Sequence, residues 1–135
     1  MTPQDTAERF VRAINAHDLE RLASLMTSDH RFIDSMGDVV EGRSAMLEGW
    51  KAYFAMVPDY KLEISHCFVA TKNATEVMLV GEASGSCQLK GVRRADSSWN
   101  TPTAVRAVVR GDQIAEWQVY ADNEPIRQQM RAASV

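Results

Sequence analysis

Two neighbouring segments near the C-terminus alternate between inward and outward residues, and this alternation constrains the fold more than any other feature of the chain. Residues two apart on a strand point to the same face of a sheet. The first segment places one set at Trp99, Thr101, Thr103, Val105, Ala107 and Val109. The second does so at Ala115, Trp117, Val119 and Ala121. Both segments therefore predict strands that each bury one face.

The turn between these strands sets their register. It consists of Arg110, Gly111 and Asp112. A three-residue loop would place both odd-numbered sets on one face, whereas a two-residue loop would mismatch them. The sequence therefore predicts a three-residue hairpin loop, with Val105 opposite Trp117 and Arg106 opposite Glu116.

Three helices are predicted before the main run of strands. Thr2 and Pro3 resemble an N-cap and a first helical position, and apolar residues follow at helical spacing to Ile14. Asp18 can cap a second helix whose buried stripe runs to Met26, with a break at 27–29. The third helix runs from about 43 to 57, and Pro58 prevents its continuation.

The remaining segments read mainly as strands. Phe32 to Asp34 predicts a short strand that turns at 37–38 into a second one. A later strand places His66 on the same face as Leu62, Ile64 and Phe68. Residues 75–87 are apolar on both faces at first, which is typical of a central strand. Residues 88–98 are predicted to form a loop, and 125–130 a short helix.

Helices first and strands last indicate an α+β domain with an antiparallel sheet. A strongly curved sheet can close into a cone around the N-terminal helices and leave a pocket in its mouth. The 135 residues suit a single domain that spans 1–135.

Composition argues against several classes of function. The net charge is −3 and no basic stripe gathers the Lys and Arg residues, which disfavours a nucleic-acid partner or an anionic membrane. No apolar run approaches a membrane span, and the first residues lack a signal-peptide pattern, so a cytoplasmic location is expected. Cys67 and Cys87 are expected to be free thiols. The histidines show no metal-ligand spacing, and no glycine-rich phosphate loop is present, so we predict neither a metal nor a cofactor.

Asp34 is the residue most suggestive of chemistry. It shares a strand face with Phe32, and a carboxylate directed at an apolar interior is costly unless it is paired, hydrogen-bonded or protonated. Such a carboxylate can act as a general base. The alternative is that Asp34 simply begins a turn, a position that Asp favours.

Four stretches together resemble the nuclear transport factor 2-like superfamily, in particular its SnoaL-like polyketide cyclase and ketosteroid isomerase-like group. They are residues 10–18, 26–37, 42–46 and 111–122. The resemblance covers nearly the whole chain and implies a cystatin-like cone: a curved sheet wrapped around N-terminal helices. The same fold hosts enzymes and non-enzymes.

The resemblance also implies roles for single residues. Asp34 matches the general base of ketosteroid isomerase, where a tyrosine and a protonated aspartate hold the oxyanion. In this chain Phe10 occupies the position of that tyrosine. The position of the protonated aspartate lies near Val105, where no acid is present on that face. Both oxyanion donors of ketosteroid isomerase are therefore missing. His66 and Tyr53 are the replacement donors that we predict as catalytic partners. The alternative for each is a structural role in the core.

Other site residues are predicted mainly as apolar walls for a small apolar molecule. They are Phe10, Ile14, Phe32, Trp50, Phe54, Trp99, Val105, Trp117 and Val119. Asn100 is expected to be a turn residue. Asp122 fits a helix cap or a subunit interface better than a catalytic role.

Three functions remain open at this stage. The first is a cofactor-free isomerase, cyclase or dehydratase that removes a proton next to a carbonyl. The second is a domain that binds a hydrophobic ligand without chemistry, and the third is a hydrolase like the epoxide hydrolases of the superfamily. A homodimer is predicted through the outer sheet face, at Arg106, Val108, Glu116, Gln118 and Tyr120.

Overall fold

A computed structural model describes residues 2–70, 72, 75–87 and 98–133 of the chain. Its elements occur in the order α1 (Pro3–Asn15), α2 (Leu19–Leu25), β1 (Met26–Ile33), β2 (Val39–Glu41), α3 (Arg43–Met56), β3 (Lys61–Val69), β4 (Glu76–Ser86), β5 (Ser98–Arg110), β6 (Gln113–Ala121) and α4 (Glu124–Ala133). The predicted α+β fold is confirmed. The loop predicted at 88–98 lies almost wholly outside the described residues.

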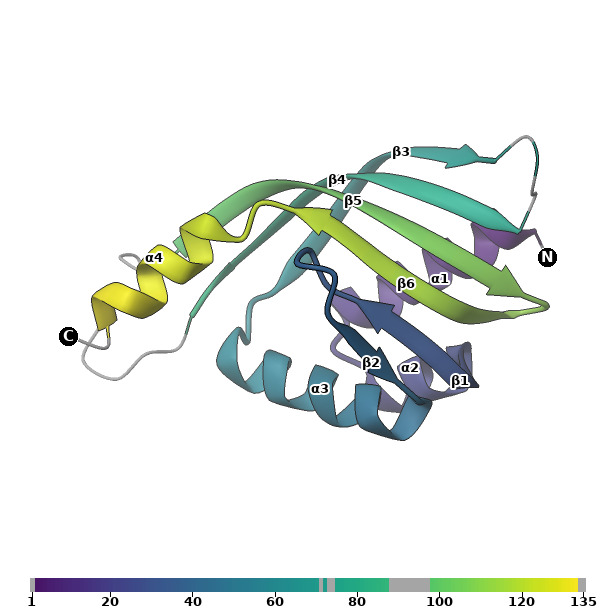
Figure 1. Ribbon diagram of the computed structural model, residues 1–135, viewed down its shortest axis with the longest axis horizontal. Helices are drawn as coiled ribbons and strands as arrows, with labels where there is room; N and C mark the ends of the chain where they lie inside the picture. Colours follow the sequence, from purple (N-terminus) through teal and green to yellow (C-terminus); the bar gives the residue numbers. More distant parts are fainter. Residues whose placement is uncertain (1, 71, 73–74, 88–97, 134–135) are drawn as a thin grey trace.

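The strands form one six-stranded sheet in the order β2-β1-β6-β5-β4-β3. Helix α1 packs against β3 to β6, and α3 contacts β1 and β2, so the helices line one side of the curved sheet (Figure 1). Most neighbouring strands are antiparallel, but β1 runs parallel to β6. The prediction of an antiparallel sheet is therefore wrong for this one pair of strands, whose connection spans most of the chain.

Local signals account for the helix boundaries. Thr2 accepts a hydrogen bond from the Asp5 amide, and the Asp5 carboxylate accepts one from the Thr2 amide, which forms a capping box. Asp18 caps α2 by accepting from the Arg21 amide. Helix α2 ends at Leu25, and Met26 already begins β1, so residues 27–29 belong to a strand rather than to the predicted break.

The hairpin between β5 and β6 has a different register from the predicted one. Arg110 pairs with Gln113 across a two-residue loop, and Val105 lies opposite Val119 instead of Trp117. Gly111 adopts a φ of 66°, as the first position of a hairpin turn of the II′ type requires. A bulge at Ala115 then brings odd-numbered residues of β5 opposite odd-numbered residues of β6 again. The predicted buried face is therefore correct, although the predicted register is wrong.

A second bulge, in β3, reverses the faces of that strand. The register shifts between Ile64 and His66. Cys67 then pairs with the fully buried Leu79, so Cys67 faces the helices. The β3 backbone runs so close to β4 here that a Cβ on Gly81 would lie 1.8 Å from the Glu63 carbonyl oxygen, which only glycine tolerates.

The buried core joins the sheet to the helices. Phe10 of α1 packs its ring against Trp117 of β6, with 4.6 Å between the ring centroids. Ile14, Leu22 and Leu79 are fully buried around them. In the part of the chain that the structure describes, no helix has the length and apolar character needed to cross a membrane.

Candidate functional site

A cavity of about 310 Å³ lies between α3 and the inner face of β5 and β6. This volume is typical of small-molecule sites. It is about twice the roughly 150 Å³ that holds a benzene molecule in an engineered cavity, so it suits a molecule of about two rings. Apolar side chains supply most of its wall, namely Phe32, Val40, Met46, Trp50, Leu62, Trp99, Val105, Trp117, Val119, Ala121 and Ile126.

Asp34 lines this cavity and also begins a turn. Its Oδ1 accepts hydrogen bonds from the amides of Met36 (2.9 Å) and Asp38 (3.0 Å). Its own amide donates to the Asp38 carbonyl at 2.9 Å. Both side-chain bonds fall on Oδ1, and no described residue donates to Oδ2. The turn therefore fixes the carboxylate and leaves one oxygen for a ligand.

A polar cluster continues from Asp34 along the end of the sheet. The amide nitrogen of Asn123 donates to the hydroxyl of Ser35, and both residues line the cavity. Thr101 donates to the Asp122 carbonyl at 3.0 Å, and Thr103 donates to the Thr101 carbonyl at 3.2 Å. Asp34 is the one carboxylate among the described lining residues.

Trp50 offers a hydrogen-bond donor that no described residue uses. The residue is 5% exposed, and its indole nitrogen has no partner. Its ring lies 6.1 Å from Phe32 and 6.4 Å from Tyr53. Buried donors are normally paired, so this unpaired indole N–H is an exception, and Trp50 itself lines the cavity. The Trp99 indole nitrogen is buried without a described partner in the same way, and it lies near the Cys87 thiol, whose pKa is raised by burial and lowered in part by Trp99.

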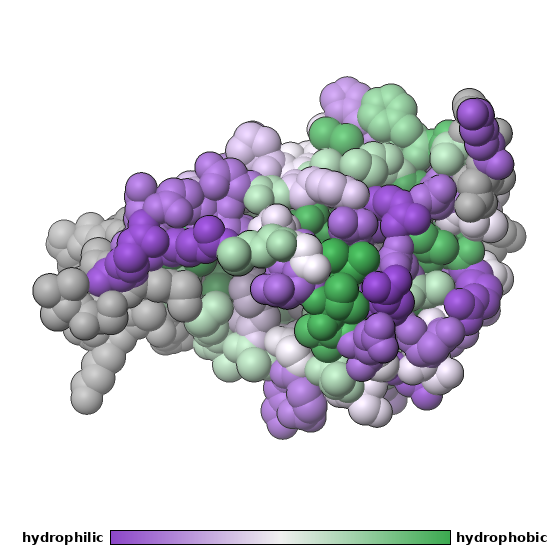
Figure 2. Space-filling view, in the orientation of Figure 1, coloured by the Kyte–Doolittle hydropathy of each residue, from purple (hydrophilic) through white to green (hydrophobic). Residues whose placement is uncertain are grey.

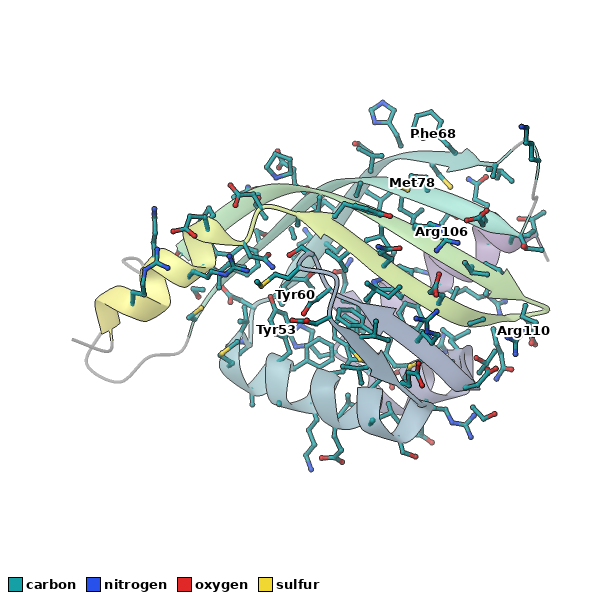
Figure 3. The ribbon with its side chains drawn as sticks, viewed as in Figure 1. Tyr53, Tyr60, Phe68, Met78, Arg106 and Arg110 are labelled. Carbon is teal, nitrogen blue, oxygen red and sulfur yellow. The ribbon has the colours of Figure 1, made fainter. Side chains whose placement is uncertain are left out.

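Tyr53 and Tyr60 stand together on the wall between α3 and the sheet (Figure 3). Their rings meet edge to face, with 5.0 Å between the centroids. Burial raises the pKa of Tyr60 to about 12, and burial with the nearby Tyr60 and Cys87 raises the pKa of Tyr53 further. Both phenols therefore stay protonated near neutral pH and can donate hydrogen bonds.

The structure places His66 away from this cavity, so its predicted inward orientation is wrong. The side chain is exposed on the outer face, stacked on Phe68 with 6.1 Å between the ring centroids. Ser65 Oγ lies 3.0 Å from its Nδ1. The cause is the β3 bulge, which exchanges the two faces after Ile64.

The other predicted site residues fall into two groups. Phe32, Tyr53, Trp50, Trp99, Val105, Trp117 and Val119 line the cavity with Asp34. Phe10, Ile14 and Phe54 are buried in the core and are not among the described lining residues. Asp122 caps α4, because its carboxylate accepts from the Glu124 amide at 2.9 Å.

Asn123 and Tyr60 are two of the lining residues that the sequence analysis did not predict as site residues. Asn123 continues the odd-numbered face of β6 past the strand end, so extending the alternation by one step would have found it. Tyr60 lies in the short connection between α3 and β3, where no periodicity applies. No group of three potential metal ligands gathers among the residues that the structure describes.

Comparison with known families agrees with this architecture. A family model described as a SnoaL-like domain matches residues 7–117. This chain belongs to the SnoaL-like domain family. The comparison with curated proteins returns no match.

Solved structures support the same fold. A protein with a ketosteroid isomerase-like fold from Catenulispora acidiphila, in complex with trimethylamine, is 20% identical and has a TM-score of 0.78, over 96% of this chain and 93% of that chain. IdmH of Streptomyces antibioticus, a proposed polyketide cyclase, is 21% identical with a TM-score of 0.79, over 97% and 99%. A proposed SnoaL-like polyketide cyclase from Shewanella denitrificans is 14% identical with a TM-score of 0.79, over 96% and 97%. At these identities the SnoaL-like domain shares their fold.

Proposed function

We propose that this SnoaL-like domain is a cofactor-free enzyme that removes a proton from a carbon next to a carbonyl group of a small apolar molecule. The observation that carries the proposal is that Asp34 lines the cavity with one carboxylate oxygen, Oδ2, to which no described residue donates, and that Trp50, whose buried indole N–H has no described partner, lines the same cavity. Isomerisation, cyclisation and dehydration can all begin with this step.

In that step the bond between the α-carbon and its hydrogen breaks, and the proton moves to Asp34 Oδ2. The electron pair is delocalised onto the carbonyl oxygen, which becomes an enolate. The indole N–H of Trp50 and the hydroxyl of Tyr53 donate to this oxygen. Donors fixed in advance stabilise developing charge more than water does, and one such donor contributes roughly 3–4 kcal/mol. The proton then returns to carbon, to a different carbon in an isomerase.

Asp34→Asn tests the assignment of the base, and Asp38→Asn is its matched control because Asp38 lies in the same turn and is not among the described lining residues. Exchange of the α-protons of 1-tetralone in D₂O, followed by NMR, reports the step directly. We expect Asp34→Asn to lose about 10²- to 10⁴-fold in rate, as removal of a general base does. Equal rates for Asp34→Asn and the wild type would reject Asp34 as the base.

A domain that binds a hydrophobic ligand without chemistry is the second candidate. Its support is that Asp34 Oδ1 already caps the amides of Met36 and Asp38, which a turn residue does without any catalytic role. In that case Asp34 Oδ2 orients the ligand by one hydrogen bond, and Asp34→Asn changes affinity while no protein-dependent exchange occurs. An epoxide-hydrolase-like activity has less support, because Asp34 is the single carboxylate among the described lining residues and no arginine accompanies it.

The outer sheet face is the proposed contact of a homodimer. Glu76 and Glu116 both pair with Arg106, and Arg31 extends the charged row. Beside this row Phe68 is 57% and Tyr120 48% exposed. Figure 2 shows hydrophobic residues gathered beside charged ones in this view of the molecule. Apolar area flanked by internally paired charges suits a contact between two copies.

A further inference from the structure

The hydroxyl of Tyr60 is a polar group whose position is fixed but whose hydrogen bonds are not used by any described residue. Its ring is held between Tyr53, at 5.0 Å, and Trp99, at 6.0 Å between centroids. The side chain lines the cavity. A protonated phenol in such a position can donate to an acceptor on a ligand.

The backbone that carries Tyr60 is held from three sides. Its amide donates to the Val57 carbonyl at 3.1 Å, and its own carbonyl accepts from Nε2 of His17 at 3.0 Å. The neighbouring Asp59 accepts from both the amide and the hydroxyl of Ser86, each at 2.8 Å. These bonds tie the connection between α3 and β3 to the end of α1 and to β4.

Close packing adds to this bracing. A Cβ on Gly85 of β4 would lie 2.4 Å from a methyl carbon of Val57 and 3.3 Å from the Trp99 ring, so the strand and the connection touch without a side chain between them. A side chain that packing and hydrogen bonds hold in one place can recognise a ligand atom with little loss of conformational entropy.

Tyr60 and Asp34 line the same cavity from segments that adjoin strands on different sides of the sheet, β3 and β1. Asp34 follows β1, and Tyr60 precedes β3, and four strand spacings separate β1 from β3 in the sheet. At about 4.8 Å per spacing, the two strands are about 19 Å apart when measured along the curved sheet. Trp50 and Tyr53 lie between them, as the ring contacts from Phe32 through Trp50 and Tyr53 to Tyr60 show.

We propose that Tyr60 is a specificity residue that donates a hydrogen bond to a second oxygen atom of the ligand, on the side remote from the reacting carbonyl. The ligand class is then a carbonyl compound of about two fused rings with an oxygen function at each end. This inference rests on the proposed function, because it takes the carbonyl end of the ligand to lie at Asp34.

Two probes of nearly equal size test this assignment: 1-tetralone, with one oxygen, and 6-hydroxy-1-tetralone, with a second oxygen across the ring system. Binding can be followed by the fluorescence of the three tryptophans of the chain, all of which line the cavity. We expect the wild type to bind the hydroxy ketone more tightly, and Tyr60→Phe to lose about two- to tenfold in affinity for it. Affinity for 1-tetralone should be unchanged. Tyr120→Phe, on the exposed outer face, is the matched control and should alter neither probe.

The outcomes separate this inference from the proposed function. A loss restricted to the hydroxy ketone in Tyr60→Phe supports the role of Tyr60. If Tyr60→Phe weakens both probes equally, or neither, the inference is overturned, while exchange that depends on Asp34 can persist. If exchange proves independent of Asp34 but the selective loss occurs, the proposed function fails and Tyr60 remains a recognition residue for the second oxygen. Equal melting temperatures and near-ultraviolet circular dichroism must accompany each variant.

Discussion

His30 gives the fold a stability that depends on pH. The residue is fully buried in β1, where its ring stacks near Phe10 at 6.1 Å between centroids. Its Nδ1 donates to the Ile114 carbonyl at 2.8 Å, so the neutral ring carries its proton there. Nε2 is buried with no partner among the described residues. A second proton would therefore be placed in the core without an acceptor.

Burial is the main cause that lowers the pKa of His30 below its ordinary value of 6.5, while the Ile114 carbonyl, Asp29 and Glu116 raise it in part. The folded protein thus binds fewer protons than the unfolded chain below pH 6.5. The stability that neutral His30 contributes is complete above pH 6.5 and is lost as the pH falls towards the folded pKa. The slope approaches about 1.4 kcal/mol per pH unit for one proton, so the loss between about pH 6.5 and 5 is at most about 2 kcal/mol.

Urea unfolding between about pH 5 and 7.5 measures this slope. We expect the free energy of unfolding of the wild type to fall with pH in that window. His30→Gln should be less stable at neutral pH, since it disturbs a buried hydrogen bond, but its stability should be nearly flat over the same window. His66→Gln, on the exposed outer face, should keep the wild-type slope. Parallel slopes for the wild type and His30→Gln would refute the reasoning.

Three further predictions concern packing, the oxyanion donor and assembly. Gly81→Ala should destabilise the fold by about 1–3 kcal/mol or more, because the added Cβ would clash with the backbone of β3. Gly49→Ala on α3, whose added Cβ would lie 3.7 Å from its nearest neighbour, should be neutral or stabilising by up to about 1 kcal/mol. Equal melting temperatures of the two variants would contradict this prediction. Trp50→Phe should lower the rate of α-proton exchange by about 10²-fold, and an unchanged rate would remove Trp50 as a donor. Tyr120→Asp and Phe68→Asp should shift the proposed dimer towards monomer in sedimentation, and a wild type that sediments as a monomer at micromolar concentrations would exclude the dimer.

Local chemistry made the helices and the buried face of β5 and β6 predictable. Thr2 and Asp5 specify the start of α1 through reciprocal hydrogen bonds within one turn, and Pro3 does so through its fixed φ. In β5 and β6 the apolar residues occur mainly at odd-numbered positions, so the sequence predicts which face of each strand points inward. It does not predict the register between the two strands. The period-two spacing between Phe32 and Asp34 predicts that the two share a strand face, and both residues line the cavity.

The features that sequence did not predict depend on partners distant in the chain. The bulge at Ser65 accompanies the close approach of β3 to Gly81, and no local pattern of β3 reveals it, so His66 was assigned to the wrong face. The parallel pairing of β1 with β6 joins segments at opposite ends of the chain. Tyr60 reaches the cavity because His17 and Ser86 brace its loop, which only the assembled fold brings together.

The rate of α-deuterium incorporation into 1-tetralone by the wild type, Asp34→Asn and Asp38→Asn measures the proposed chemistry most directly. Removal of an α-proton by Asp34 Oδ2 predicts protein-dependent exchange in the wild type and in Asp38→Asn, and a loss of at least about 10²-fold in Asp34→Asn alone. The proposal would be contradicted if the wild type exchanged at the same rate as Asp34→Asn, or no faster than buffer without protein.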